Sequence, residues 1–197
     1  MADRVQVAVL LSGRGTNMLA LSEHKRRDPD RPYDIALVAS NVPDARGLVL
    51  ARRLGIETWA QSHKGLSREE FDRLLDAELR RRGIELVALA GYMRLLSAGF
   101  VHAWAGRILN IHPSLLPLYK GVDTHARALA AGELEAGCSV HVVTHELDDG
   151  PVIAQARIRI RPRETAETLA ARVLEEEHRL YPLALEDYSR LLREPAE

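Results

Sequence analysis

Asn110 and His112 are the residues of this sequence whose types and spacing point most directly to chemistry. The apolar run 108–111, bounded by Gly106 and Pro113, is predicted to form a buried strand. Residues two apart on a strand point the same way, so Asn110 and His112 share one side of the strand end. Ligands of parallel sheets bind at that end. An amide beside an imidazole suits acyl transfer, in which a carbonyl oxygen becomes an oxyanion and an amine loses a proton.

A carboxylate for this imidazole is available in the segment 148–151, Asp-Asp-Gly-Pro. A neighbouring carboxylate favours the imidazolium form of histidine, so either Asp148 or Asp149 would turn His112 into a proton donor for an oxyanion. A plainer interpretation stays open. In it, Asn110 ties down a turn, His112 is a hydrogen-bonded loop histidine, and the two aspartates are ordinary turn residues.

A second candidate site is the glycine-rich turn 12–17, Ser-Gly-Arg-Gly-Thr-Asn, which follows the apolar strand Val5–Leu11. A helix is predicted over Met18–Lys25, and strand, turn and helix in this order offer backbone N–H groups to a phosphate. The pattern departs from dinucleotide-binding turns, because Met18 replaces the third glycine. The second strand ends in Ser40-Asn41, without the carboxylate that would hold an adenosine ribose. A single phosphate is therefore preferred over a dinucleotide, with a plain tight turn as the alternative.

Other chemistry is less well supported. His141 and His145 are four residues apart, which along a strand is about 13 Å and too far for one metal ion. Ser114 lies in no nucleophile elbow, and the lone cysteine, Cys138, is expected in the core. Arg94 follows a buried strand and is expected either to meet an anionic ligand or to form a surface salt bridge.

The amino-acid composition argues against several other classes of protein and partner. The chain has 197 residues, a net charge of -1 and 5% aromatic residues, which argues against nucleic acid and acidic membrane surfaces as partners. One cysteine excludes an intrachain disulfide. There is no apolar stretch of the roughly twenty residues that a membrane helix needs, and no signal core at the N-terminus. We expect a soluble, cytoplasmic protein with one domain over residues 1–197 and small-molecule substrates, and leave monomer and homodimer open.

Strands and helices alternate along the sequence without a linker or repeat. This order predicts one doubly wound α/β domain with a mostly parallel sheet, closed by two antiparallel strands over 138–143 and 152–160. A capping box at Ser67–Glu70 predicts the start of a helix through Arg82. Two further helices are expected at the C-terminal end of the chain, Thr165–His178 and Tyr181–Leu192.

Several spaced motifs together resemble the folate-dependent formyltransferases, over about Val7 to Tyr181. The shared segments are Asn110-Ile-His-Pro-Ser-Leu-Leu-Pro117, Ser139-Val-His141, Glu146-Leu-Asp148 with Gly150-Pro151, Ser12-Gly-Arg-Gly-Thr-Asn17, Ser40-Asn41, Ala90-Gly-Tyr-Met-Arg94 and Glu177-His178. The last four narrow the resemblance to the branch that formylates glycinamide ribonucleotide in purine synthesis. The resemblance implies the formyltransferase fold, with a Rossmann-like N-terminal half, and 10-formyltetrahydrofolate as cosubstrate, without a metal.

The resemblance also implies roles for individual residues. Asn110, His112 and Asp148 would be the catalytic trio, with Asn110 and His112 stabilising an oxyanion while Asp148 keeps His112 protonated and helps to shuttle a proton through water. The nucleotide and its phosphate would bind to Gly13, Gly15, Thr16, Asn17, Met18, Leu19 and Glu177. The folate would bind to Arg68, Met93, Arg94, Leu95, Leu96, Asn110, Thr144, His145, Glu146, Leu147 and Asp148.

Two positions depart from the pattern of the resemblance: Val122-Asp123 in the loop after Pro117, and Arg14 between the two glycines.

Three other functions are weighed. A methionyl-tRNA formyltransferase would need a further C-terminal domain and a basic surplus. A formyltetrahydrofolate hydrolase would carry an N-terminal regulatory domain. A catalytically silent folate- or nucleotide-binding module would not need the intact trio.

Overall fold

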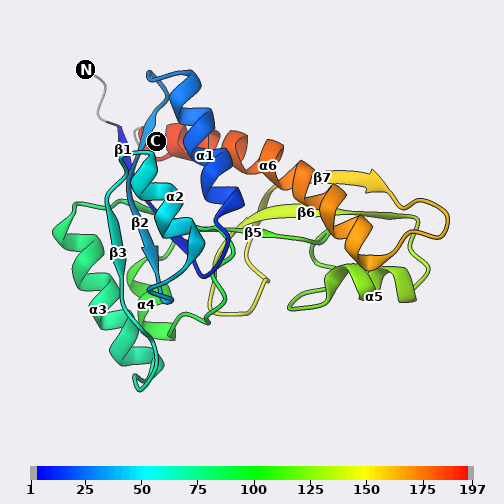
Figure 1. Cartoon of the computed structure of the whole chain (residues 1–197), viewed down its shortest axis with the longest axis horizontal. Coiled ribbons are helices and arrows are strands. Elements are labelled where there is room, and N and C mark those ends of the chain that lie inside the picture. The colour runs from blue at the N-terminus through cyan, green and yellow to red at the C-terminus, as the bar shows by residue number, and fades with distance from the viewer. Residues whose placement is uncertain (1–3, 195–197) are drawn as a thin grey trace.

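Seven strands form one sheet in the computed structural model, which describes residues 4–194 (Figure 1). Their spatial order is β3-β2-β1-β4-β5-β6-β7. The first five are parallel, and β6 and β7 run antiparallel to their neighbours. The bounds are β1 Val5–Leu11, β2 Tyr33–Ser40, β3 Thr58–Ala60, β4 Leu86–Leu89, β5 Ile108–His112, β6 Glu135–Val142 and β7 Val152–Arg159. The expected mostly parallel α/β fold is confirmed.

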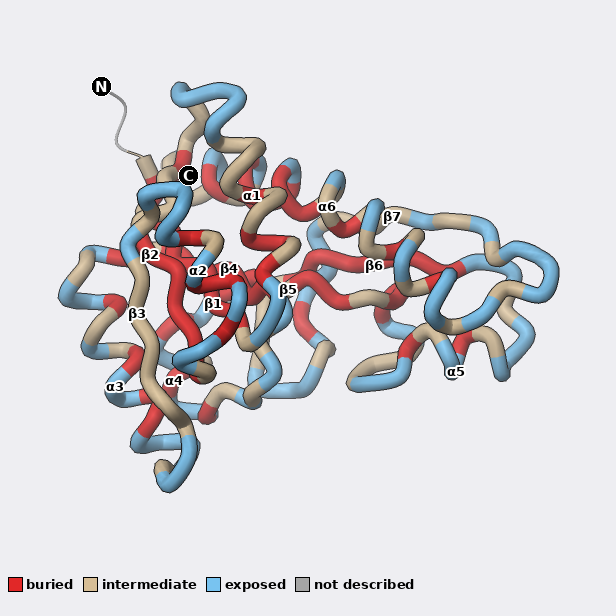
Figure 2. The backbone as a smooth tube through the Cα atoms, viewed as in Figure 1, coloured by how far each residue is buried: buried red, intermediate tan, exposed pale blue. Residues whose placement is uncertain are grey.

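Helices cover both faces of the sheet, which explains why its central strands are mostly apolar rather than alternating. One face packs against α1, α2 and α6, and the other against α3 and α4. Figure 2 shows buried residues concentrated along the central strands. The helix bounds are α1 Thr16–Arg27, α2 Arg46–Arg53, α3 Arg68–Arg81, α4 Ala98–Ala103, α5 Thr124–Ala130 and α6 Ala166–Leu191.

One prediction for the C-terminal segment is wrong. Two helices were expected, Thr165–His178 and Tyr181–Leu192, but α6 runs unbroken over 26 residues with Pro182 inside it. A proline removes one helical hydrogen bond and usually bends or ends a helix. Here the apolar stripe of the helix continues through it, from Val173 to Leu185, and both of these side chains are fully buried. Packing on the sheet therefore overrides the local penalty.

Three smaller features bear on the site. The helix α4 was not predicted; Ser97 caps it by accepting a hydrogen bond from the backbone N–H of Phe100. The predicted capping box of α3 is present, with Ser67 and Glu70 exchanging hydrogen bonds. The expected antiparallel pair of strands is also present, although β6 begins at Glu135 instead of Cys138.

The hydroxyl of Tyr181 ties α6 to the middle of the sheet. It donates to the carbonyl oxygens of Leu89 and Leu109, at 3.0 and 3.3 Å, from a fully buried position. We expect Tyr181→Phe to lower the free energy of unfolding by about 1 kcal/mol, since it removes these bonds without changing the packing. Urea denaturation would measure the loss. Tyr188→Phe, which removes a more exposed bond to Gly106, is the matched control, with an expected change of under about 0.5 kcal/mol.

The expected single domain over residues 1–197 includes residues 1–3 and 195–197, which lie outside the described residues. Between residues 4 and 194, none of the helices is both long enough and apolar enough to span a membrane.

Candidate active site

The predicted trio meets at the end of β5, and a fourth side chain connects it. Nδ1 of His112 lies 3.4 Å from a carboxylate oxygen of Asp148. The Asn110 amide nitrogen is 3.2 Å from Nε2 of His141, which lies 3.6 Å from the other oxygen of Asp148. These groups are shielded from water, since the side chains of His112, His141 and Asp148 are at most 9% exposed. The arrangement combines an amide donor, two imidazoles and one carboxylate.

His141 was not among the predicted site residues, although its motif was noted. The signal lay in strand register: β6 pairs antiparallel with β5, and its register places His141 directly opposite Asn110. Alternation along β6 then puts the His141 side chain on the same face as Ser139. Ser139 supports the loop that follows β5, because its hydroxyl donates to the Ser114 carbonyl and accepts from Leu116 N–H.

The carboxylate of Asp148 is stabilised in its charged form. Burial raises the pKa of Asp148, but the nearby His141 imidazole, the hydrogen bond from the Gly121 N–H and the charge of His112 outweigh it and lower the pKa overall. The Gly121 N–H donates to the carboxylate at 2.9 Å. Asp148 has a left-handed backbone with φ of 50°, a conformation that aspartate tolerates better than most residues. Of the two aspartates, Asp148 therefore contacts His112.

The ring of His112 lies between two acceptors. Nε2 is 3.0 Å from the carbonyl oxygen of Tyr119, which only accepts hydrogen bonds, so Nε2 carries a proton. Nδ1 faces the Asp148 carboxylate. An imidazole with an acceptor on each side is best matched when both nitrogens are protonated. Both ring nitrogens of His112 therefore have an acceptor within reach.

The glycine-rich turn leads from β1 into α1. Gly15 has φ of 79°, and a Cβ there would lie 2.6 Å from the Cα of Gly47. No side chain caps α1, so its first backbone N–H groups are left available to an anion. The turn is fixed against α2 by a hydrogen bond from Gly47 N–H to the Gly13 carbonyl. This arrangement supports the interpretation of the turn as a phosphate site.

Glu177 joins the turn to α6. Its carboxylate accepts a hydrogen bond of 2.7 Å from the Asn17 amide, and both side chains are buried. Burial raises the pKa of Glu177, and the bond from Asn17 offsets only part of that shift. The structure therefore brings Asn17 and Glu177, which are 160 residues apart, into one part of the candidate site.

The predicted folate residues fall into two groups. Met93 and Leu95 are 76% and 52% exposed on the loop between β4 and α4. Arg94 forms no surface salt bridge among the described residues; it packs over the Phe71 ring and donates to the Ser67 carbonyl. Leu96 is half-buried, and Arg68 begins α3 beside Ser67. The other group, Thr144, His145, Glu146 and Leu147, leads into Asp148; Thr144 is half-buried, and His145, Glu146 and Leu147 are exposed.

A polar network not foreseen from the sequence links the glycine-rich turn to the loop that carries Met93. The Ser12 hydroxyl donates to the Asn41 side chain at 2.6 Å and accepts from the Met93 N–H at 2.8 Å. His63 contacts Asn41 from the other side. Ser12, Asn41 and Met93 follow β1, β2 and β4, so their contact arises from the parallel order of these strands.

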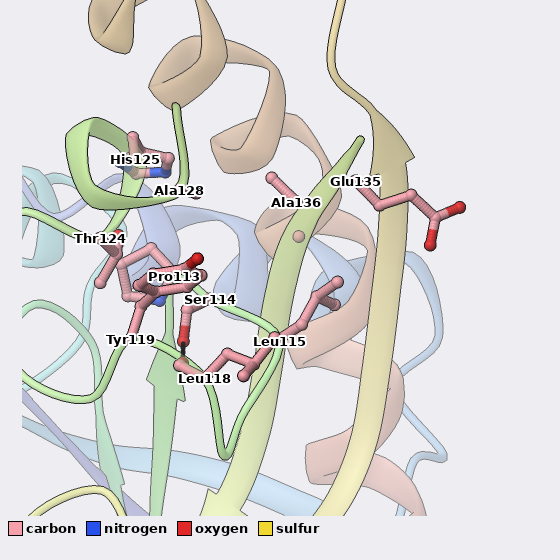
Figure 3. Close-up of a pocket in the computed structure, with 11 residues that line it drawn as sticks. Pro113, Ser114, Leu115, Leu118, Tyr119, Thr124, His125, Ala128, Glu135 and Ala136 are labelled. Atoms are coloured by element: carbon pink, nitrogen blue, oxygen red, sulfur yellow. Dashed lines mark hydrogen bonds between the residues drawn. The ribbon is translucent and has the colours of Figure 1, made fainter. Parts of the chain in front are cut away.

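Two hollows lie near the predicted site residues, one beside the loop after β5 and one beside the start of α1. A small cavity of about 20 Å³, drawn in Figure 3, lies between the loop after β5, α5 and the start of β6, with Ser114 and His125 in its lining. Its volume suits about one water molecule. A groove of about 480 Å³ runs between α1 and α6, and Thr16, Leu19 and His178 line it. The predicted nucleotide residue Met18 is instead fully buried in the core.

The described part of the chain contains neither a metal-binding cluster nor a reactive cysteine. Residues 4–194 contain no group of three or more histidine, cysteine, aspartate or glutamate side chains placed to hold a metal ion. Cys138 is buried in the core as expected, and burial raises the pKa of its thiol to about 12, so it is not a nucleophile.

Comparison with known proteins identifies the family and similar structures. The family described as Formyl transferase matches residues 5–185. Phosphoribosylglycinamide formyltransferase of Escherichia coli (strain K12) is 43% identical over 182 residues, which are 92% of this chain and 85% of that protein. The crystal structure of phosphoribosylglycinamide formyltransferase from Brucella melitensis has a TM-score of 0.89 at 47% identity, covering 95% of this chain and 96% of that one.

A longer relative shows the same segment inside a larger protein. The human trifunctional purine biosynthetic protein adenosine-3 is 42% identical over 184 residues, which are 93% of this chain but 18% of that protein. The chain thus spans less than a fifth of this trifunctional relative. Since the family match covers all seven strands and includes Asn110, His112 and Asp148, this chain belongs to the formyl transferase family.

Proposed function

We propose that this protein transfers a formyl group from 10-formyltetrahydrofolate to the amine of glycinamide ribonucleotide, as a step of purine synthesis. The observation that carries the proposal is the His112–Asp148 pair beside Asn110 and His141 at the end of β5. Such a cluster can stabilise an oxyanion and move a proton without a covalent intermediate on the protein. The likeness to proteins named for this reaction supports the choice of substrates.

The reaction requires one bond to form and one to break. The amine nitrogen of the ribonucleotide forms a bond to the formyl carbon, and the bond from that carbon to N10 of the folate breaks. One proton passes from the amine to N10. Between these events the formyl oxygen carries negative charge, which His112 and Asn110 stabilise by donating hydrogen bonds. Asp148 balances the charge of His112 and takes part in moving the proton.

The site residues divide into a catalytic and two binding sets. Asn110, His112 and Asp148 act on the reacting atoms, and His141 orients Asn110 and Asp148 through its contacts with both. The turn with Gly13, Gly15, Thr16, Asn17 and Leu19, together with Glu177, holds the ribonucleotide, and Met18 can contribute only its backbone, because its side chain is buried in the core. Arg68, Met93, Arg94, Leu95 and Leu96 and the segment Thr144–Asp148 hold the folate.

The test is a formyl-transfer assay with the purified chain and 10-formyltetrahydrofolate, with and without glycinamide ribonucleotide. Folate turnover that depends on the nucleotide, with formylated nucleotide as product, is the expected result. Equal turnover without the nucleotide would identify a hydrolase and contradict the proposal. Absence of turnover in a folded protein would contradict it as well and favour a binding role.

Glycine substitutions test the phosphate turn separately. Gly13 has open space where a Cβ would lie, so Gly13→Val should leave the fold intact and obstruct the turn. We expect the KM for the nucleotide to rise about tenfold or more, because one hydrogen bond to a charged group is worth about 1.5–3 kcal/mol. The folate KM should stay unchanged. Steady-state kinetics measure both, and an equal rise in the two KM values would disprove the phosphate role.

The choice of glycine matters for this experiment. Gly15→Val would combine a positive φ with a clash against Gly47, so any effect would include strain in the fold. Gly99 in α4 also has nothing near its Cβ position. Gly99→Val is therefore the matched control, and we expect wild-type KM values from it.

A further inference from the structure

The loop 118–123 holds both members of the catalytic pair by backbone groups. The Tyr119 carbonyl accepts the hydrogen bond from Nε2 of His112 at 3.0 Å, and the Gly121 N–H donates to Asp148 at 2.9 Å. Backbone groups are placed by the path of the chain and not by the identity of the side chain. The positions of His112 and Asp148 therefore depend on the conformation of this loop.

That conformation is not one that the loop adopts easily by itself. Tyr119 and Asp123 have φ values of 55° and 57°, in the left-handed region that disfavours residues with a side chain. Gly121 between them has φ of 82°. Residues held in such conformations persist where surrounding contacts support them. The loop must therefore be held from outside.

Arg127 on α5 supplies the most extensive of these contacts. One guanidinium nitrogen donates to the carbonyl oxygens of Lys120 and Val122, at 2.6 and 3.2 Å. The guanidinium also lies over the Tyr119 ring, 5.4 Å from its centre. Three of the six loop residues are thus contacted by one side chain. A planar guanidinium combines such bonds with ring stacking, which a lysine does not.

Other side chains hold the loop at single points. The Tyr119 hydroxyl donates to Glu133 at 2.7 Å, the Ser114 hydroxyl donates to the Leu118 carbonyl at 2.6 Å, and Lys120 pairs with Asp149. None of these bonds spans the segment from Lys120 to Val122. That segment contains Gly121, the donor to Asp148.

We propose that Arg127 is a positioning residue, which acts on the reaction by holding the loop 118–123 so that its backbone fixes His112 and Asp148. The catalytic consequence rests on the proposed function, whereas the positioning itself does not. Arg127 contacts neither member of the pair in any interaction found among the described residues, so its effect passes through Tyr119 and Gly121.

The electrostatic consequence concerns Asp148. The charged or titratable groups that face it are His112 from β5 and His141 from β6, and the loop adds the Gly121 N–H. Lys120 pairs with the adjacent Asp149. The Gly121 bond lowers the pKa of Asp148, so displacement of the loop should raise that pKa towards its ordinary value.

The experiment compares Arg127→Gln with the wild type by two readouts. The first is a ¹³C NMR titration of the Asp148 carboxyl carbon in the ligand-free protein, assigned by its absence in Asp148→Asn. We expect its midpoint to rise by about half a pH unit or more, because a hydrogen bond to the charged form is lost. The second is formyl transfer, where kcat should fall about tenfold, with both KM values within about threefold of the wild type.

Two further variants make the outcome decisive. Arg107→Gln is the matched control, because Arg107 also packs over a ring, that of Trp104, and donates to one carbonyl, that of Ala103. It should leave the titration and kcat unchanged. Arg127→Lys keeps the charge, should restore part of both effects, and replaces Arg127→Gln if that variant does not fold.

The outcomes separate this inference from the proposed function. An unchanged Asp148 titration in both Arg127 variants would overturn the positioning role, whatever the activity. A shifted titration in a protein without formyl-transfer activity would support the positioning role and contradict the proposed function. A shifted titration with wild-type kcat in an active enzyme would overturn the claim that positioning serves the reaction.

Discussion

His112→Ala should lower the turnover of formyl transfer by at least about a hundredfold. The imidazole lies between the Tyr119 carbonyl and the Asp148 carboxylate, so it is held as a donor for the developing oxyanion. A donor of this kind is worth about 3 kcal/mol in the transition state. The loss should appear in kcat, measured at saturating concentrations of both substrates, because the charge on the formyl oxygen develops during the reaction.

The bound formyl oxygen must compete for this donor. Nε2 of His112 already donates to Tyr119, and a formyl oxygen that accepts from the same N–H would share or take that bond. His112→Gln keeps much of the side-chain volume and serves as a second variant in case alanine disturbs the buried site. His102→Gln, an exposed histidine on α4, is the control. Turnover near that of the wild type in a folded His112 variant would rule out this assignment.

Asp148→Asn is expected to reduce turnover to a similar degree, by about a hundredfold or more. The amide is nearly the same shape and tolerates the left-handed backbone at φ of 50°, but it carries no charge to balance His112. The change therefore isolates the charge from the geometry. Single-turnover kinetics with both substrates bound would measure it, and circular dichroism would confirm that the fold is intact.

The pH dependence of activity and stability should reveal the contribution of the Asp148 charge. The pKa of Asp148 is lowered in the folded protein, so its carboxylate is present throughout the neutral range. Its contribution to activity and to stability should be lost only as the pH falls through this lowered value. Asp149→Asn is the neighbouring control: its exposed pair with Lys120 should be worth under about 1 kcal/mol. A comparable loss of turnover in both variants would argue against a special role for Asp148.

The elements with strong local signals were predictable from the sequence. The strand β1 is buried on both faces, and its nearly continuous apolar run, broken only by Gln6, is the pattern of such strands. The capping box at Ser67 fixed the start of α3. Where the local signals were weaker, helices were missed or wrongly divided. The short helix α4 has only six residues, and Pro182 suggested a break where burial of the neighbouring apolar side chains keeps α6 continuous.

The residues of the candidate site also differ in how far the sequence alone could predict them. Asn110 and His112 could be paired from the sequence because two-residue spacing on one strand fixes their common side. The turn residues alone did not separate Asp148 from Asp149, and only the resemblance to the formyltransferases selected Asp148; in the fold it is Asp148 that faces the imidazole, while Asp149 pairs with Lys120. His141 and Arg127 gave no comparable local signal, because their contacts depend on strand register and on the path of a loop.

The sequence by itself therefore determined the alternation of strands and helices, the burial of the central strands and the chemical types gathered near β5. Local periodicity, capping and turn residues encode these features over a few neighbouring positions. Only the tertiary structure decided that His141 bridges Asn110 and Asp148, that Glu177 meets Asn17, and that backbone groups of the loop 118–123 hold the pair. These contacts join residues far apart in the chain, and their geometry is set by strand order and packing.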